Sequence, residues 1–171
     1  MQRPTLFLLL LVFTIACNNP KPTASVIVHG GAGYVTTDDM TEQQEKEIRE
    51  TIEKSLQKSN EHLANGGTSV EAVQIAINIL EDSTHFNAGK GSVFTSAGTH
   101  ELDASIMNGK NVQAGAVAGL TNIKNPIDAA IAVMEHSPHV FLIGKGAEEF
   151  ALAHGMETVP QSYFYNEDRY I

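Results

Sequence analysis

The first half of the chain carries apolar residues at helical spacing. Residues 41–44 (TEQQ) match a capping box, and one apolar face follows, formed by Ile48, Ile52, Leu56 and Leu63. The glutamates and lysines between them indicate a solvated face, and the glycines at 66 and 67 predict the helix end. A second capping box, residues 68–71 (TSVE), opens a helix to about Leu80. That helix is apolar around most of its circumference, so we expect it to be buried.

From Ser92 to Leu120 the apolar spacing changes to two, which is typical of strands. Residues 101–106 alternate, and Asn108-Gly109 is a strong hairpin signal. In the next segment, one face is lined by Val112, Ala114, Ala116, Ala118 and Leu120. Its other face is also small or apolar, so we expect a central strand covered on both sides. A β-branched run, residues 25–29, predicts a further strand that ends in a glycine-rich loop.

The last third of the chain predicts two more helices. Asn125 as N-cap and Pro126 at the first position predict a helix that runs to residues 136–137. Residues 140–143 read as a brief apolar strand or a turn of core, and residues 146–154 predict the last helix, closed by Gly155. After residue 160 no pattern is evident. Helices before and after an antiparallel meander predict an α+β fold with helical layers on the sheet.

The first 16 residues are predicted to be an export signal. Arg3 precedes an unbroken, mostly apolar run at residues 6–16, which is too short to span a membrane. Cys17 follows at the position where a bacterial lipoprotein carries its lipid, although Thr14 stands where leucine is usual. We therefore predict a signal peptide (1–16), a lipidated Cys17, a polar tether (17–25) and a periplasmic or outer-membrane location. Plain secretion is the alternative.

Composition narrows the class of protein. The 171 residues suggest one domain, and 42% hydrophobic with 18% charged residues is ordinary for a globular chain. The net charge of -9 argues against binding to nucleic acid or to an anionic membrane, because both require basic patches. The membrane contact we expect is through the lipid anchor alone. A single cysteine excludes an intrachain disulfide.

Residues 85–94 (HFNAGKGSVF) come close to a phosphate-binding loop. The match fails because Gly91 rather than Ser or Thr follows Lys90, and because Thr84 stands where the first glycine belongs. The sequence after it continues as a strand rather than a helix. Residues 29–33 (HGGAG) also lack the glycine spacing of a dinucleotide site. We therefore exclude a nucleotide site.

Side-chain types alone yield no complete catalytic set. The seven histidines include no zinc-binding H-E-x-x-H pair, and each is interpreted as a surface or capping residue. Carboxylates that are adjacent in a helix, such as Glu148 and Glu149, point in different directions and do not make a dyad. A G-x-S-x-G nucleophile elbow is also missing from the sequence.

Several segments together resemble the plant-type asparaginases, also called isoaspartyl (β-aspartyl) peptidases, within the N-terminal nucleophile hydrolases. These segments are residues 28–33 (VHGGAG), 86–89 (FNAG), 91–93 (GSV), 100–107 (HELDASIM), 114–118 (AGAVA), 125–127 (NPI), 139–140 (HV), 142–144 (LIG) and 146–147 (GA). Their order and spacing fit from about Val26 to Pro160. The resemblance implies that residues 26–160 are the α-half of a four-layer αββα sandwich, with a linker beginning at 161–171.

The resemblance implies a protein made as one precursor with an α-half and a β-half. The precursor cuts itself, and a threonine becomes the first residue of the β-half. The resemblance therefore implies hydrolysis of L-asparagine and β-aspartyl peptides, an (αβ)2 assembly, and a β-half as partner. The expected Thr-Val-Gly segment is not in this chain, so the chain alone is expected to be inactive. An N-terminal threonine is suited to this chemistry because its own α-amine can act as the base for its hydroxyl.

The resemblance also assigns site residues. Asn87 corresponds to an active-site neighbour of the nucleophile, while a turn-stabilising asparagine is the alternative. His29, Gly30, Gly31 and Gly33 correspond to a backbone loop near the nucleophile, while a plain strand-ending turn is the alternative. No organic cofactor is implied, but a structural sodium ion is. Its ligands by position are the backbone carbonyls of Leu80, Glu81, Ser83, Phe86, Ala88 and Lys90.

Two other functions remain open. Glycosylasparaginase, which cleaves the bond between glycan and asparagine, is a sibling that uses the same type of nucleophile. The His-Gly-Gly sequence at residues 29–31, near the start of the matching region, and the segment that resembles the sodium loop favour the isoaspartyl peptidase. The second alternative is a non-catalytic, lipid-anchored binding protein that kept the α-fold. It is disfavoured because it would leave sheet edges and apolar faces open to aggregation.

Overall fold

A computed structural model describes residues 24–31 and 40–167. The predicted signal peptide (1–16), Cys17 and Gly33 lie outside these described residues, as does most of the predicted tether (17–25). Across the described ranges, no helix combines the length and the apolar composition that a membrane crossing requires.

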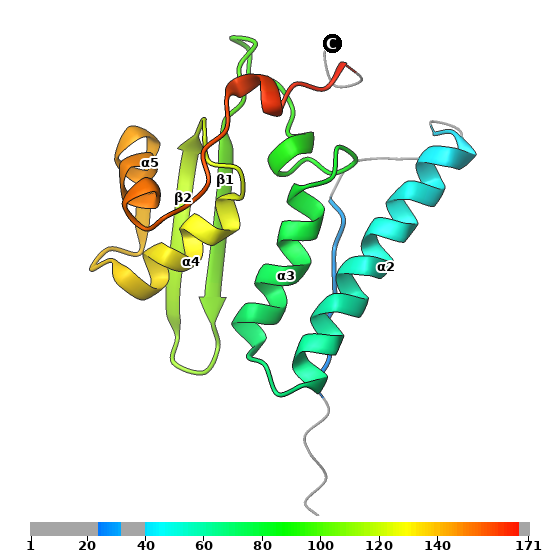
Figure 1. The fold of residues 1–171 in the computed structure, drawn as a ribbon. Coiled ribbons are helices and arrows are strands. Elements are labelled where there is room, and N and C mark those ends of the chain that lie inside the picture. The colour runs from blue at the N-terminus through cyan, green and yellow to red at the C-terminus, as the bar shows by residue number, and fades with distance from the viewer. Residues whose placement is uncertain (1–23, 32–39, 168–171) are drawn as a thin grey trace, which may run out of the picture.

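The two helices predicted for the first half are confirmed with their capping boxes. Helix α2 spans Glu42–Ala64, and the Thr41 Oγ1 accepts a hydrogen bond from the Gln44 N–H. The Gln44 side chain in turn accepts one from the Thr41 N–H. Helix α3 spans Ser69–Glu81 and begins with an equivalent capping box. The two helices pack side by side (Figure 1).

Helix α3 is only half buried, which corrects the expectation of a buried helix. Ala72, Ala76 and Leu80 are buried, whereas Val73 is 42% exposed. The helix packs on α2 and makes fewer contacts with α4. Its isoleucines at 75, 77 and 79 are only partly buried in the described part of the chain, and Ile77 packs against the core.

Three strands form one sheet in the order β1-β2-β3: Leu102–Asn108, Gln113–Leu120 and Phe141–Ile143. Strands β1 and β2 pair antiparallel through the predicted hairpin, whereas β3 pairs parallel with β2. The sheet is therefore mixed, and the predicted all-antiparallel arrangement is wrong. A helix lies between β2 and β3 in the chain and supplies the crossover that a parallel pair requires.

A β-bulge interrupts the pairing of β1 with β2. Two residues of β2, Ala118 and Gly119, lie opposite one residue of β1, Asp103. Gly119 has a φ of 65°, which suits glycine at such a bulge. The extra residue shifts the alternation, so Leu120 is buried on the side of Val117 and does not share the face of the alanines as predicted.

Helices α4 (Pro126–His136) and α5 (Gly144–Ala153) cover one face of the sheet (Figure 1). The core between helices and sheet contains Leu102, Ile106, Val117, Leu120, Ile127, Ala130, Val133 and Ala147. Strand β2 and helix α4 come very close at Gly115, where a Cβ would overlap the Ala130 carbonyl oxygen and the Met134 nitrogen. Helix α4 begins as predicted, and α5 begins two residues before the predicted start at residue 146.

The opposite face of the sheet is uncovered in the part of the chain that the structure describes. Met107, Phe141 and Ile143 are 60%, 54% and 64% exposed. Register places Phe141 beside Ala116 and Ile143 beside Ala118, so these side chains share one apolar face. Strand β2 is central, as predicted, but it is covered on one face only.

Two segments with strand-like patterns form no strand among the described residues. Residues 25–29 have no strand partner there, and Ile27 is 94% exposed. Residues 92–101 form a loop in which the Thr95 N–H donates to the Thr99 carbonyl. Alternation favours an extended chain, but a strand also needs a neighbouring strand, and neither segment has one here.

The C-terminal part of the described chain packs on the core. A 3-10 turn, η3 (Gln161–Tyr163), is followed by Phe164, which is fully buried. The Gln161 side chain accepts a hydrogen bond from the His100 N–H (2.8 Å) and donates to the carbonyls of His100 and Thr121. This amide therefore holds the chain end against the segment that leads into β1.

Candidate functional site

The loop that follows α3 directs several backbone carbonyls to one place. It contains a 3-10 turn, η2 (Gly89–Gly91). A Cβ on Gly91 would overlap the Phe86 carbonyl oxygen and lie 2.8 Å from those of Ser83 and Thr84. A Cβ on Gly89, whose φ is 51°, would overlap the Glu81 carbonyl oxygen. The absence of a Cβ on these glycines thus lets carbonyl oxygens approach their backbone closely, and oxygen ligands of this kind suit a hard cation.

The other predicted sodium ligands lie in the same loop. The Leu80 carbonyl accepts a hydrogen bond from Ser83, and the Ala88 carbonyl accepts one from Gly91. Each carbonyl oxygen has a second lone pair that can bind a cation. The Lys90 ammonium lies over the Tyr163 ring, 5.6 Å from its centre. The side chain of Lys90 therefore points to the C-terminal segment and leaves only its carbonyl for the role predicted by resemblance.

Asn87 is exposed and holds the loop in shape. Its Oδ1 accepts a hydrogen bond from the Val93 N–H at 3.0 Å. The turn-stabilising role that the sequence left open is therefore present. A carboxamide that accepts with its oxygen keeps two N–H donors. The same side chain can thus hold the loop and offer a donor to a bound group.

The described part of the predicted glycine loop, residues 29–31, lies against this segment. A Cβ on Gly30 would be 3.1 Å from the Phe86 ring and 3.6 Å from Ile52 of α2. The Gly31 N–H donates to the His29 Nδ1 at 3.2 Å, and His29 itself is exposed. The structure therefore brings residues 29–31 and the Asn87 loop together, although they are far apart in the sequence.

The end of the described chain lies beside the same loop. The Asn166 Nδ2 donates to the Thr84 carbonyl at 3.3 Å, and the Tyr165 ring packs edge-on against Phe94 at 5.5 Å. Figure 1 shows the C-terminal segment, in red, at the end of the molecule where α3 finishes and β1 begins. Three separate parts of the chain thus meet at this end.

The Glu81 carboxylate connects the loop to α4. It accepts hydrogen bonds from the Ile127 N–H (3.0 Å) and the Asn125 Nδ2 (3.1 Å). Asn125 was predicted to cap α4 with its side chain, but it makes no such bond and Glu81 does so instead. The pKa of Glu81 is raised to about 8: burial is the largest cause, the two hydrogen bonds act against it, and the charges of Asp128 and Asp82 add to it.

Ser92 and His100 form a buried pair that the sequence pattern missed. The Ser92 Oγ lies 3.1 Å from the His100 Nδ1, and the residues are 4% and 2% exposed. The His100 ring packs between Phe94 and Phe164, and its Nε2 has no hydrogen-bond partner in the described part of the chain. The prediction that every histidine is a surface or capping residue is therefore wrong for His100, which is buried. The pair has the spacing of a nucleophile and its base, but a substrate could not reach it.

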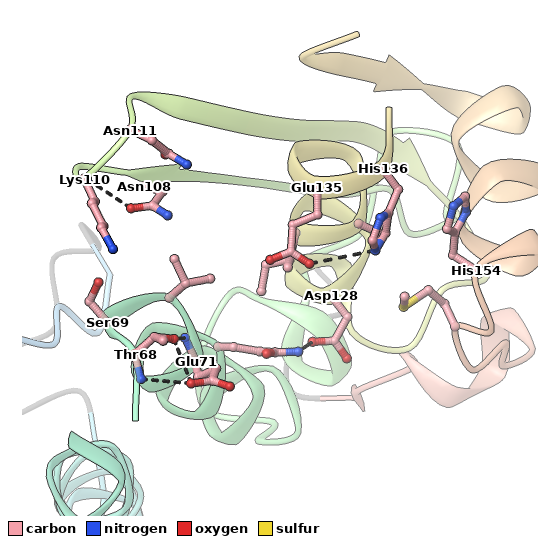
Figure 2. Close-up of a pocket in the computed structure, with 15 residues that line it drawn as sticks. Thr68, Ser69, Glu71, Asn108, Lys110, Asn111, Asp128, Glu135, His136 and His154 are labelled. Atoms are coloured by element: carbon pink, nitrogen blue, oxygen red, sulfur yellow. Dashed lines mark hydrogen bonds and ion pairs between the residues drawn. The ribbon is translucent and has the colours of Figure 1, made fainter. Parts of the chain in front are cut away.

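A large groove of about 910 Å³ lies elsewhere, between the start of α3, the β1–β2 hairpin and α4 (Figure 2). None of the predicted site residues lines it. Its carboxylates are engaged: Glu71 bonds to His62 at 3.0 Å, and Asp128 accepts from Gln74 and Asn78. Within residues 24–31 and 40–167, no group of three or more His, Cys, Asp and Glu is placed to hold a metal ion.

Comparison with known proteins gives a consistent result. The sequence model of a family described as asparaginase matches residues 22–171. Isoaspartyl peptidase from Escherichia coli K12 is 44% identical over 147 residues, which are 86% of this chain and 46% of that protein. Isoaspartyl peptidase/L-asparaginase from Bos taurus is 42% identical over 142 residues, 83% of this chain and 45% of that protein. Plant-type L-asparaginase from Pyrococcus abyssi is 45% identical over 130 residues, 74% of this chain and 40% of that protein. The chain spans less than half the length of these relatives.

Proposed function

The chain belongs to the asparaginase family, and from this premise we propose that it is the N-terminal portion of an enzyme that hydrolyses L-asparagine and β-aspartyl (isoaspartyl) peptides. The observation that carries the proposal is the meeting of three segments at one end of the molecule. These are the Asn87 loop, residues 29–31 and the end of the described chain. Because relatives are about twice as long, we propose that the part beyond Ile171 supplies the nucleophile.

The proposed nucleophile is a threonine freed at the start of the β-half by self-cleavage. Its α-amine takes the hydroxyl proton while the Oγ bonds to the substrate's β-carbonyl carbon. The carbon–nitrogen bond then breaks, and ammonia or a peptide amine leaves with that proton. Water hydrolyses the resulting ester and restores the threonine. In this chain the Asn87 amide is the proposed hydrogen-bond donor to the developing charge, and Val93 fixes its orientation.

The uncovered face of the sheet supports the wider architecture that we propose. Exposed Met107, Phe141 and Ile143 form an apolar surface of the kind that marks an interface. We propose that a second sheet, from the part beyond Ile171, covers it and completes a four-layer αββα sandwich. An (αβ)2 assembly and export with a lipid anchor at Cys17 complete the proposal.

The test is a comparison of substrates with the full-length protein. We expect release of aspartate from a β-aspartyl dipeptide to be faster than cleavage of a glycosylated asparagine. The opposite preference would identify a glycosylasparaginase. Failure to cleave either substrate, or a natural stop codon directly after Ile171, would contradict the proposal and favour the non-catalytic binding protein.

We further propose that the loop after α3 holds a sodium ion. The residues fit, because the carbonyl oxygens of Ser83 and Phe86 converge beside Gly91 and the Glu81 carbonyl oxygen lies close to Gly89 in the same loop. A bound cation would tie the carbonyls together and stiffen the loop that carries Asn87. It would not take part in bond breaking.

Sodium is expected to stabilise the full-length protein. Replacing sodium chloride by choline chloride at the same ionic strength should lower Tm by roughly 2–6 °C, because a ligand that binds only the folded state raises its stability. Gly91→Ala should abolish the difference, because its Cβ would overlap the Phe86 carbonyl oxygen and displace the converging carbonyls. Gly146→Ala is the matched control, since a Cβ there meets no atom within 4 Å. Equal Tm values for the wild type in the two salts would contradict the proposed site.

A further inference from the structure

One carboxylate stands on the uncovered apolar face of the sheet. Along β1, Leu102 and Ile106 face the helices, whereas Asp103 and Met107 are exposed on the other side. The Asp103 Oδ1 accepts a hydrogen bond from the Gly119 N–H at 2.9 Å. That bond is made at the bulge, so the position of Asp103 is fixed by the backbone of β2.

The strands around Asp103 carry no positive charge, and Lys145, the residue after Gly144, lies on α5 within 3.7 Å of Glu149. The three strands of the described sheet, with sequences LDASIMN, QAGAVAGL and FLI, contain neither lysine nor arginine. The neighbouring side chains on this face are the exposed, neutral Ser105, alanines and exposed apolar residues. A cover that removes water from this face therefore leaves the carboxylate with neutral donors only among the described residues: the Gly119 N–H and, at most, the Ser105 hydroxyl.

The backbone beside Asp103 leaves room for a long side chain that comes from whatever covers this face of the sheet. Gly119 and Gly144 lie next to each other, since a Cβ on Gly119 would be 3.8 Å from the Gly144 nitrogen. Both glycines have positive φ values and carry no side chain that would fill the space. An ammonium or guanidinium group could approach the carboxylate across these two residues.

We propose that the part of the protein beyond Ile171 places a lysine or arginine against the Asp103 carboxylate where it covers this face. The inference rests on the proposed function, because that proposal provides the cover. An ionised carboxylate that loses water is strongly destabilised unless it is paired. The Gly119 N–H supplies one neutral hydrogen bond, whereas a cation neutralises the charge and makes a stronger, charge-assisted bond.

The experiment compares variants of the full-length protein by thermal unfolding. Asp103→Asn keeps an oxygen for the Gly119 N–H but leaves the opposing cation unpaired, so we expect its Tm to fall by at least about 6 °C. Asp103→Leu should fall at least as far, and Asp103→Glu should retain more of the wild-type Tm than Asp103→Asn. Glu149→Gln is the matched control, because Glu149 is exposed and pairs with exposed Lys145 at 3.7 Å.

Each outcome decides the inference. If Asp103→Asn unfolds within about 1 °C of the wild type, or if Asp103→Glu is less stable than Asp103→Asn, the group opposite is not a cation and the inference is overturned. The reaction is assayed separately on the wild-type protein with a β-aspartyl dipeptide. Lack of hydrolysis together with a destabilised Asp103→Asn would overturn the proposed reaction and leave the charge pair standing.

Discussion

Asn87→Asp in the full-length protein is expected to lower kcat/KM for a β-aspartyl dipeptide by roughly 100-fold, because removal of one donor to a developing oxyanion typically costs that much. Aspartate keeps the oxygen that accepts the Val93 N–H, so the loop should hold its shape. It loses the N–H donors and adds a negative charge beside the reacting carbonyl. Steady-state kinetics should show the loss mainly in kcat, because the donor acts on the transition state.

Two further variants separate the role in the reaction from the role in the loop. Asn87→Ala removes the bond to Val93 as well, so it should lose both activity and Tm. Asn60→Asp is the matched control, because Asn60 is exposed on α2 and far along the chain from the loop. An Asn87→Asp variant with wild-type kinetics would mean that Asn87 only stabilises the turn.

Elements whose signals are local could be predicted from the sequence. The boxes at residues 41–44 and 68–71 predicted where α2 and α3 begin, because a capping box closes its hydrogen bonds within four residues. Pro126 predicted the start of α4, and Asn108-Gly109 predicted the hairpin. In these cases the residues that decide the structure are neighbours in the chain.

Features that depend on distant partners were missed. The parallel pairing of β3 joins residues that a whole helix separates, and the bulge at Gly119 reverses the face on which Leu120 lies. Residues 25–29 have a strand pattern but no partner strand among the described residues. Period-two alternation indicates an extended chain and is silent about what lies beside it.

The candidate site shows the same limit. Carbonyl ligands place no demand on side chains, so the loop after α3 carries no signature beyond its glycines. The buried pair of Ser92 and His100 lies across a turn, and the Gln161 side chain reaches His100 across 61 positions. Resemblance to a family could point to Asn87, but its bond to Val93 could only be seen in the folded loop.

Phe141→Lys is expected to lower the Tm of the full-length protein by roughly 10 °C or more. Phe141 is 54% exposed in the described chain, on the face that we propose a second sheet covers. There the variant would lose an aromatic contact and bury an ammonium group, a combined cost of roughly 3–5 kcal/mol or more. Leu152→Lys is the matched control: Leu152 is 60% exposed, but it lies on α5, away from the uncovered face. Differential scanning calorimetry gives both values.

In the 171-residue chain alone, the same substitution should be favourable rather than harmful. There the uncovered face remains in water, so a lysine at 141 should reduce self-association measured by sedimentation velocity, because it breaks an exposed apolar patch. A lower Tm of the full-length protein, together with weaker self-association of the shorter chain, is specific to a surface that is buried only in the longer protein. If Phe141→Lys and Leu152→Lys change the full-length Tm equally little, the face is open in the native protein and the four-layer arrangement is wrong.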